Sequence, residues 1–131
     1  MIPALLTAPD FRRWPNFTVA EMSCKHTGEC RMDPGFMDRL QRLRIAWGRP
    51  MTITSAFRAA SHPVEARKAR PGSHAMGRAV DIAVTGADAF ALVRLAYEEG
   101  FTGIGIAKTF VHLDDVPPRA THITRPMLWV Y

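Results

Sequence analysis

Residues 73–84, with the sequence SHAMGRAVDIAV, combine a turn with the beginning of a strand. Small and β-branched residues alternate in its second half, which predicts a strand over residues 79–84. Gly77 lets the backbone turn tightly just before that strand. A histidine in the turn, His74, and a carboxylate in the strand, Asp81, are therefore expected to converge on one point.

Asp81 lies between two apolar residues, Val80 and Ile82, so its charge needs compensation if the strand is buried. A metal ion or a hydrogen-bond network would compensate it. An ordinary ion pair with Arg58 or Arg78 would also do so, and the residues alone leave these alternatives open.

A second stretch with polar chemistry, FVHLD, occupies residues 110–114. Side chains on a strand alternate between its two faces, so His112 and Asp114 are expected on one face, and Val111 and Leu113 on the other. The pattern predicts a strand with one apolar face and one face that carries an imidazole and an acid.

Two imidazoles and one carboxylate are a usual ligand set of an open catalytic zinc site, whose remaining position holds water. His74, Asp81 and His112 supply that set. Zinc would activate the water for attack on a peptide carbonyl, and a nearby carboxylate would then accept a proton; Asp114 is the local candidate. Because a single histidine is more often a structural residue than a ligand, the metal interpretation depends on all three residues together.

The flanking sequence predicts both helices and strands. Residues 34–47 form the clearest helix, with Asp33 as its N-cap, a proline at its first position and Gly48 after its end. Thr18 begins a shorter helical turn through a capping box with Glu21. Further elements are a helix over residues 87–99 and strands over residues 51–57, 103–106 and 110–114.

The order of these elements indicates an α+β fold in a single domain over residues 1–131. A chain of 131 residues with 47% hydrophobic content is long enough for one core and too short for two. Residues 59–77 are expected mostly as a loop, and the segment after Asp115 as an irregular tail packed against the domain.

Composition and charge restrict the partners. A net charge of +5 and a pI near 9.9 favour an anionic partner. No recognition-helix or aromatic-stacking pattern accompanies the charge, so nucleic acid is not expected. No stretch is long and apolar enough to be a transmembrane segment, and residues 1–9 lack the basic start of a signal peptide. We therefore expect a soluble monomer made in the cytoplasm.

The two cysteines, Cys24 and Cys30, lie six residues apart with His26 between them. Structural zinc usually needs four ligands in paired short spacings, and no second pair follows at a suitable distance. Free or loosely linked thiols in a loop are the favoured interpretation, while a disulfide and a metal knuckle stay open.

At these residues the sequence resembles the zinc D-alanyl-D-alanine carboxypeptidase family, which includes the vancomycin-resistance dipeptidases and the phage L-alanyl-D-glutamate endolysins. The similarity lies in three motifs in the family's order: SAFR at residues 55–58, SHAMGRAVD at residues 73–81 and FVHLD at residues 110–114. The middle motif is the specific one. With FTVAEM at residues 17–22 and WVY at residues 129–131, the similarity extends over nearly the whole chain.

The resemblance implies a Hedgehog-like α+β fold, with a small antiparallel sheet and flanking helices, that holds Zn2+ through His74, Asp81 and His112. It also implies that Arg58 binds the carboxylate or backbone of the substrate and that Ser73 helps to orient it. The implied activity is hydrolysis of a peptide bond in peptidoglycan stem peptides, by a carboxypeptidase or an endopeptidase. A phage or prophage product that reaches the cell wall without a signal peptide would fit this activity.

One position departs from the family. In the dipeptidase and endolysin branches an acidic general base lies three residues before the last histidine ligand, where this chain has Thr109. Asp114 either carries the proton or only orients His112, and Asp115 and Glu65 are further candidates for the base. Without a base, the chain would be a non-catalytic cell-wall-binding or virion-assembly module that keeps the metal site.

Overall fold

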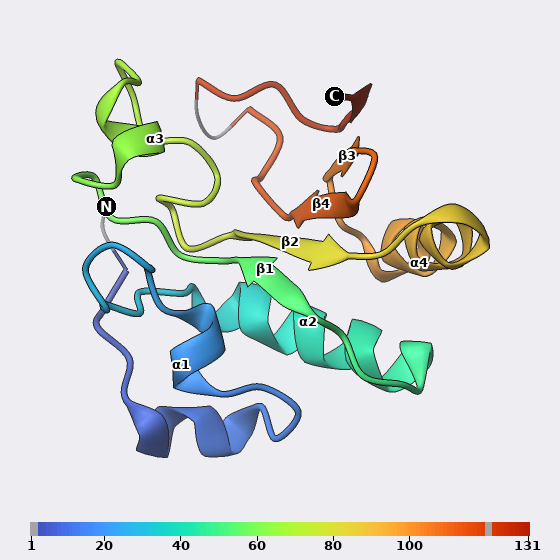
Figure 1. Cartoon of the computed structure of the whole chain (residues 1–131), viewed down its shortest axis with the longest axis horizontal. Helices are drawn as coiled ribbons and strands as arrows, with labels where there is room; N and C mark the ends of the chain where they lie inside the picture. Colours follow the sequence, from blue (N-terminus) through green and yellow to red (C-terminus); the bar gives the residue numbers. More distant parts are fainter. Residues whose placement is uncertain (1–2, 120–121) are drawn as a thin grey trace.

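The computed structural model describes residues 3–119 and 122–131. These residues form a five-stranded sheet in the order β1-β2-β4-β3-β5, with flanking helices (Figure 1). The strands are β1 (Ile53–Ser55), β2 (Ala79–Ala83), β3 (Gly103–Ile106), β4 (Phe110–Asp114) and β5 (Met127–Val130). The helices are η1 (Ala8–Arg13), α1 (Val19–Met22), α2 (Pro34–Trp47), α3 (Pro63–Ala66) and α4 (Gly86–Glu99). This architecture confirms the α+β class.

The two long helices, α2 and α4, begin and end within one residue of their predicted bounds. The Asp33 carboxylate accepts a hydrogen bond from the Phe36 N–H at 2.9 Å, and Gly48 and Gly100 end the helices in the left-handed conformation. The buried apolar side chains are Phe36, Met37, Leu40 and Leu43 on α2, and Leu92 and Ala96 on α4. These side chains join the apolar residues of the sheet in one core, whose burial is the main stabilising contribution to the fold.

The two faces of the sheet differ in chemistry. Val80 and Ile82 of β2, and Val111 and Leu113 of β4, belong to the core, as the alternation of the sequence predicts. On the other face, the register aligns one row of residues across the strands. This row consists of Ser55, Asp81, His112, Gly105 and Trp129.

Three segments contain elements that the sequence did not predict. The tail after Asp115 was predicted to be irregular, but it contains strand β5. Because β5 pairs in parallel with β3, the sheet is mixed and not purely antiparallel. Residues 59–77 include the short helix α3, and η1 lies in a segment for which the sequence predicted no element. No helix among the described residues has the length and apolar character that a membrane-spanning helix requires.

Candidate metal centre

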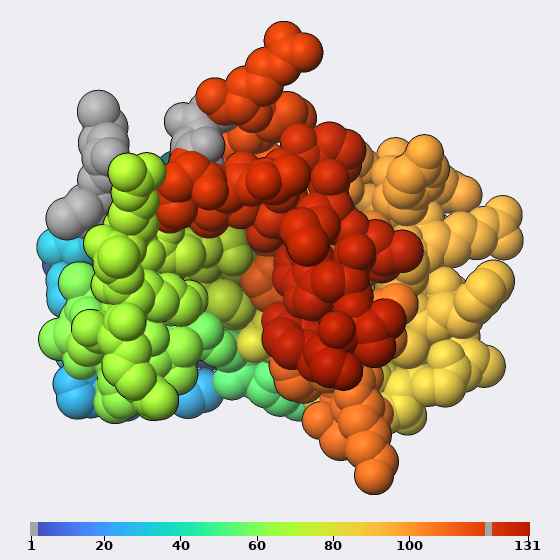
Figure 2. Space-filling model, turned by 90° about the horizontal axis from the view of Figure 1, so that it is seen from above, coloured from blue at the N-terminus to red at the C-terminus, as the bar shows by residue number. Residues whose placement is uncertain are grey.

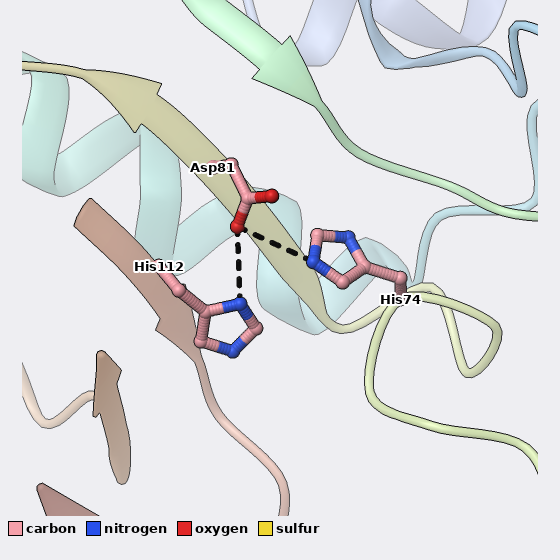
Figure 3. Close-up of side chains that lie close together, drawn as sticks. All are labelled: His74, Asp81 and His112. Atoms are coloured by element: carbon pink, nitrogen blue, oxygen red, sulfur yellow. Dashed lines mark hydrogen bonds and ion pairs between the residues drawn. The ribbon is translucent and has the colours of Figure 1, made fainter. Parts of the chain in front are cut away.

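His74, Asp81 and His112 form the candidate metal-binding group found within the described residues (Figure 3). One ligand atom of each lies within 4.8 Å of the other two. Asp81 Oδ1 is 3.3 Å from His74 Nε2 and 3.1 Å from His112 Nδ1. All three side chains are buried. The structure thus brings together the three residues that the sequence predicts as ligands.

The sheet register and one glycine turn position these side chains. Asp81 of β2 lies directly opposite His112 of β4. His74 lies in the turn before β2, where the Gly77 N–H donates to the His74 carbonyl at 3.2 Å. Gly77 has a φ of +70°, and a Cβ atom at this position would overlap the carbonyl oxygen of Arg31. Only glycine therefore fits the turn that presents His74.

Each imidazole is fixed through the nitrogen that faces away from Asp81. His74 Nδ1 donates to the Ala56 carbonyl at 2.7 Å, which leaves the lone pair of Nε2 on the Asp81 side. His112 Nε2 lies 2.7 Å from Asp114 Oδ2, which leaves Nδ1 on the Asp81 side. Hydrogen bonds of this kind are typical of metal-binding histidines, because they fix the tautomer and the ring orientation.

The electrostatics of the group favour a negative Asp81 and a neutral His74. Burial lowers the pKa of His74, because it disfavours the imidazolium. Burial alone would raise the pKa of Asp81, but hydrogen bonds with His112 and His74 hold it well below its usual range. Burial would likewise lower the pKa of His112, but its hydrogen bonds to Asp114 and Asp81 raise it. One anionic oxygen beside two imidazole nitrogens is a donor set that fits a divalent metal such as zinc.

Of the two cations predicted near Asp81, Arg58 is the one that reaches it. Arg58 Nη2 lies 3.6 Å from Asp81 Oδ2, and Arg58 Nη1 lies 3.8 Å from Glu65 Oε2. Both distances exceed those of ordinary hydrogen bonds, so the guanidinium keeps donors for a ligand. Arg78 instead pairs with Asp115 at 3.0 Å.

Asp114 lies behind His112, on the side away from Asp81. It is fully buried, and Arg125 donates to both of its oxygens, at 2.8 Å and 2.6 Å. Burial alone would raise the pKa of Asp114, but the hydrogen bonds with Arg125 and His112 lower it to about 2. The carboxylate is therefore ionised, and both of its oxygens accept hydrogen bonds.

The other two candidates for a general base, Glu65 and Asp115, also form ion pairs. Glu65 Oε2 lies 2.7 Å from Lys68 Nζ, and Glu65 Oε1 accepts a hydrogen bond from the Gly72 N–H at 3.1 Å. Asp115 pairs with Arg78, and burial raises the pKa of its carboxyl. Both carboxylates thus have structural partners.

Ser73 and the two cysteines lie outside the metal-binding group. Ser73 is buried, and its backbone carbonyl accepts a hydrogen bond from the Arg78 N–H at 3.1 Å. Cys24 and Cys30 are free and buried, which agrees with the favoured interpretation of the pair. The Ala59 N–H donates to Cys24 Sγ at 3.4 Å, so this thiol ties the segment after β1 to the loop before α2.

Two residues of the C-terminal segment, Arg125 and Trp129, contribute to the site and were not identified from the sequence. Arg125 pairs with Asp114, and the centre of the Trp129 ring lies 5.1 Å from the centre of the His112 ring. The sequence signal that points to them is GIGI at residues 103–106, because glycines at alternate positions leave one face of a strand free for another segment.

Two segments rise on either side of a hollow in the surface. Figure 2 shows the segment around α3 in green and the C-terminal segment in red, with the hollow between them. The two segments meet where His122 Nε2 donates to the Pro71 carbonyl at 2.9 Å.

Comparison with known proteins identifies the family of the chain. A family model described as Peptidase M15 matches residues 15–114, which include His74, Asp81 and His112. A search of curated proteins gives no match. The family match confirms the resemblance to the zinc D-alanyl-D-alanine carboxypeptidases that the three sequence motifs indicated. Because the matched region covers most of the chain, this protein belongs to the peptidase M15 family of metallopeptidases.

Proposed function

We propose that this chain hydrolyses a peptide bond in peptidoglycan stem peptides and that its metal is zinc. The observation that carries the proposal is the convergence of His74, Asp81 and His112, whose ligand atoms lie within 4.8 Å of one another. Membership of the peptidase M15 family supports a peptide substrate, and a net charge of +5 would hold the protein to an anionic cell wall.

The three ligands are prepared for this role by their neighbours. His74 and His112 present one nitrogen each, because the Ala56 carbonyl and Asp114 hold the other nitrogen of each ring. Asp81 supplies the negative charge. Zinc, when bound, supplies a Lewis acid that polarises the peptide carbonyl and activates water. Since the rings are already oriented, little rearrangement is needed when the metal enters.

We assign the carboxylate of the substrate to a basic pocket beside the metal-binding group. The pocket has a volume of about 220 Å³, and its lining includes Lys25, Ser55, Arg58 and His62. Arg58 connects this pocket to the metal-binding group, because its guanidinium lies 3.6 Å from Asp81. A guanidinium beside an ammonium group suits a carboxylate. Ser73, which precedes His74 in the chain, is assigned an orienting role toward the same peptide.

Asp114 is assigned the orientation of His112 rather than proton transfer, since Arg125 occupies both of its oxygens. Glu65 and Asp115 are held in ion pairs as well. The engagement of these three carboxylates favours a second candidate function, a cell-wall-binding or virion-assembly module that keeps the metal without catalysis.

Release of stem-peptide fragments distinguishes the two candidates. We expect the purified protein to hold about one zinc ion per chain and to release fragments from purified peptidoglycan, which mass spectrometry identifies. His74→Ala should lose both the zinc and the release. Arg42→Ala is the matched control, because Arg42 pairs with Glu99 at the surface and is not one of the residues assigned to the site, and it should keep both.

The remaining outcomes are equally informative. If zinc titration gave no uptake by the wild-type protein, both candidates would be wrong. Zinc uptake without products, repeated with other divalent metals, would favour the non-catalytic module. Where products appear, the masses released from a defined muropeptide identify the bond that is cut, and they separate a carboxypeptidase from an endopeptidase.

A further inference from the structure

A cluster of three side chains lies behind His112 and outside the metal-binding group. Arg125 donates to Asp114 through Nε at 2.8 Å and through Nη2 at 2.6 Å, and Asp114 Oδ2 lies 2.7 Å from His112 Nε2. The side chains of Arg125 and Asp114 are only 8% and 0% exposed. A bidentate pair this well buried holds both partners in one geometry.

Trp129 completes the cluster from the side of β5. Its ring lies 5.1 Å from the His112 ring, and the guanidinium carbon of Arg125 lies 5.0 Å from the centre of the Trp129 ring. Arg125 therefore contacts both Asp114 and Trp129, and each of these contacts His112. The imidazole is enclosed by residues that the C-terminal segment brings to it.

Strand β3 makes room for this cluster through its two glycines. A Cβ atom at Gly103 would overlap the Asp114 carboxylate and lie 2.5 Å from Arg125 Nε. A Cβ atom at Gly105 would lie 2.5 Å from Trp129 Nε1. Both glycines have ordinary backbone angles, since neither has a positive φ. Their absence of a side chain, and not backbone freedom, is therefore what the cluster uses.

We propose that Arg125 is a positioning residue for the metal site. Through Asp114 it holds the Nε2–H of His112 on the side away from Asp81, so that Nδ1 stays directed at the metal. Without this pair, the imidazole is free to turn about its Cβ–Cγ bond, which places the carbon Cδ2 where Nδ1 was and removes the ligand nitrogen from the Asp81 side. The C-terminal segment, which follows the metal ligands in the chain, thus sets the metal affinity.

The inference rests on the proposed zinc site but not on peptide hydrolysis, so zinc affinity is the readout. Competition with a chromophoric chelator measures the dissociation constant of Zn2+ for the wild type, Arg125→Gln and Arg125→Lys. We expect Arg125→Gln to bind Zn2+ about 10- to 100-fold more weakly, the usual loss when the partner of a ligating histidine is disturbed. Arg125→Lys keeps the charge and one donor, so its affinity should lie between those of Arg125→Gln and the wild type. Arg42→Gln should bind as the wild type does.

A second variant disturbs the same pair from the other side without removing a charge. Gly103→Ala pushes the Asp114 carboxylate and Arg125 apart, and it should also weaken Zn2+ binding. In zinc-loaded protein with labelled histidine, the hydrogen-bonded Nε2–H resonance of His112 should be sharp in the wild type and shifted or broadened in both variants. A cooperative thermal transition and well-dispersed amide resonances verify that each variant is natively folded.

The outcomes separate this inference from the proposed function. If folded Arg125→Gln and Gly103→Ala bound Zn2+ with wild-type affinity and kept the His112 resonance, the positioning role would be wrong while the zinc site stood. If the wild type bound no Zn2+, both would be wrong. Should Arg125→Gln fail to fold, Arg125→Lys and Gly103→Ala give the same decision.

Discussion

At the scale of single residues, the clearest prediction about stability concerns Gly77. It has a φ of +70° and packs directly on the backbone of Arg31. We expect Gly77→Ala to lower the free energy of unfolding by about 2–5 kcal/mol, because the new methyl group adds overlap to an unfavourable backbone conformation. Urea unfolding followed by circular dichroism measures the change.

Gly48 provides the matched control for this effect. Its φ is +73°, but a Cβ atom at Gly48 would meet nothing within 4 Å. Gly48→Ala should therefore lower the free energy of unfolding only by the cost of the left-handed backbone conformation, about 1–2 kcal/mol. Equal losses in the two variants would show that the close approach to Arg31 contributes nothing.

The sequence predicted the ligand group but not the residues behind it. The strand phase of residues 110–114 separates His112 and Asp114 from the apolar positions, and local spacing is enough to show this. Arg125 pairs with Asp114 only because a separate segment returns to the sheet. The glycines of residues 103–106 leave room for such a segment, but no pattern in the sequence identifies which segment returns. The role of Asp114 was left open for the same reason, since its partner was unknown.

At the scale of elements, Glu65 organises the segment between β1 and β2. Its side chain is 1% exposed, and it accepts hydrogen bonds from Lys68 and from the Gly72 N–H. Burial alone would raise the pKa of Glu65, but these hydrogen bonds lower it below the ordinary value of 4.5. The ionised carboxylate therefore stabilises the folded state above that pH, and the contribution is lost as the pH falls through the lower, folded pKa.

We expect Glu65→Gln to lower the free energy of unfolding by about 1–2 kcal/mol at neutral pH. The difference from the wild type should shrink as the pH falls below 4.5, where the unfolded carboxyl is protonated. Urea unfolding at a series of pH values measures it. Glu98→Gln, which removes an exposed pair with Arg94 on α4, should change stability by less than about 0.5 kcal/mol. A loss that did not depend on pH would assign the effect to packing instead of charge.

Elements with local signals were predicted well, and those specified by distant contacts were not. Caps and apolar periodicity gave α2 and α4 nearly to the residue. The sequence of β5, MLWV, has no alternation of polar and apolar residues, so nothing local marks it as a strand. Its structure comes from parallel pairing with β3. The four-residue helix α3 is likewise too short to carry a periodic pattern.

At the scale of the whole molecule, metal binding and folding are linked, because the ligands converge only in the folded chain. We expect Zn2+ at 100 times its dissociation constant to raise the free energy of unfolding by about 2.7 kcal/mol, and a chelator to reverse the gain. Differential scanning calorimetry with and without Zn2+ measures the shift. His74→Ala should show none, while Arg42→Ala should show the full shift. An equal shift in His74→Ala would place the bound ion elsewhere on the protein.

The row of residues that crosses the sheet has a consequence for refolding experiments. Asp81 and His112 face each other only when β2 and β4 pair in the native register. A slip of one residue in either strand turns its ligand into the apolar core and an apolar side chain into the site. Compact but misaligned molecules would retain much of their secondary structure and escape detection by circular dichroism. A zinc titration of a refolded sample would not count them, so it measures the yield of correctly aligned chains.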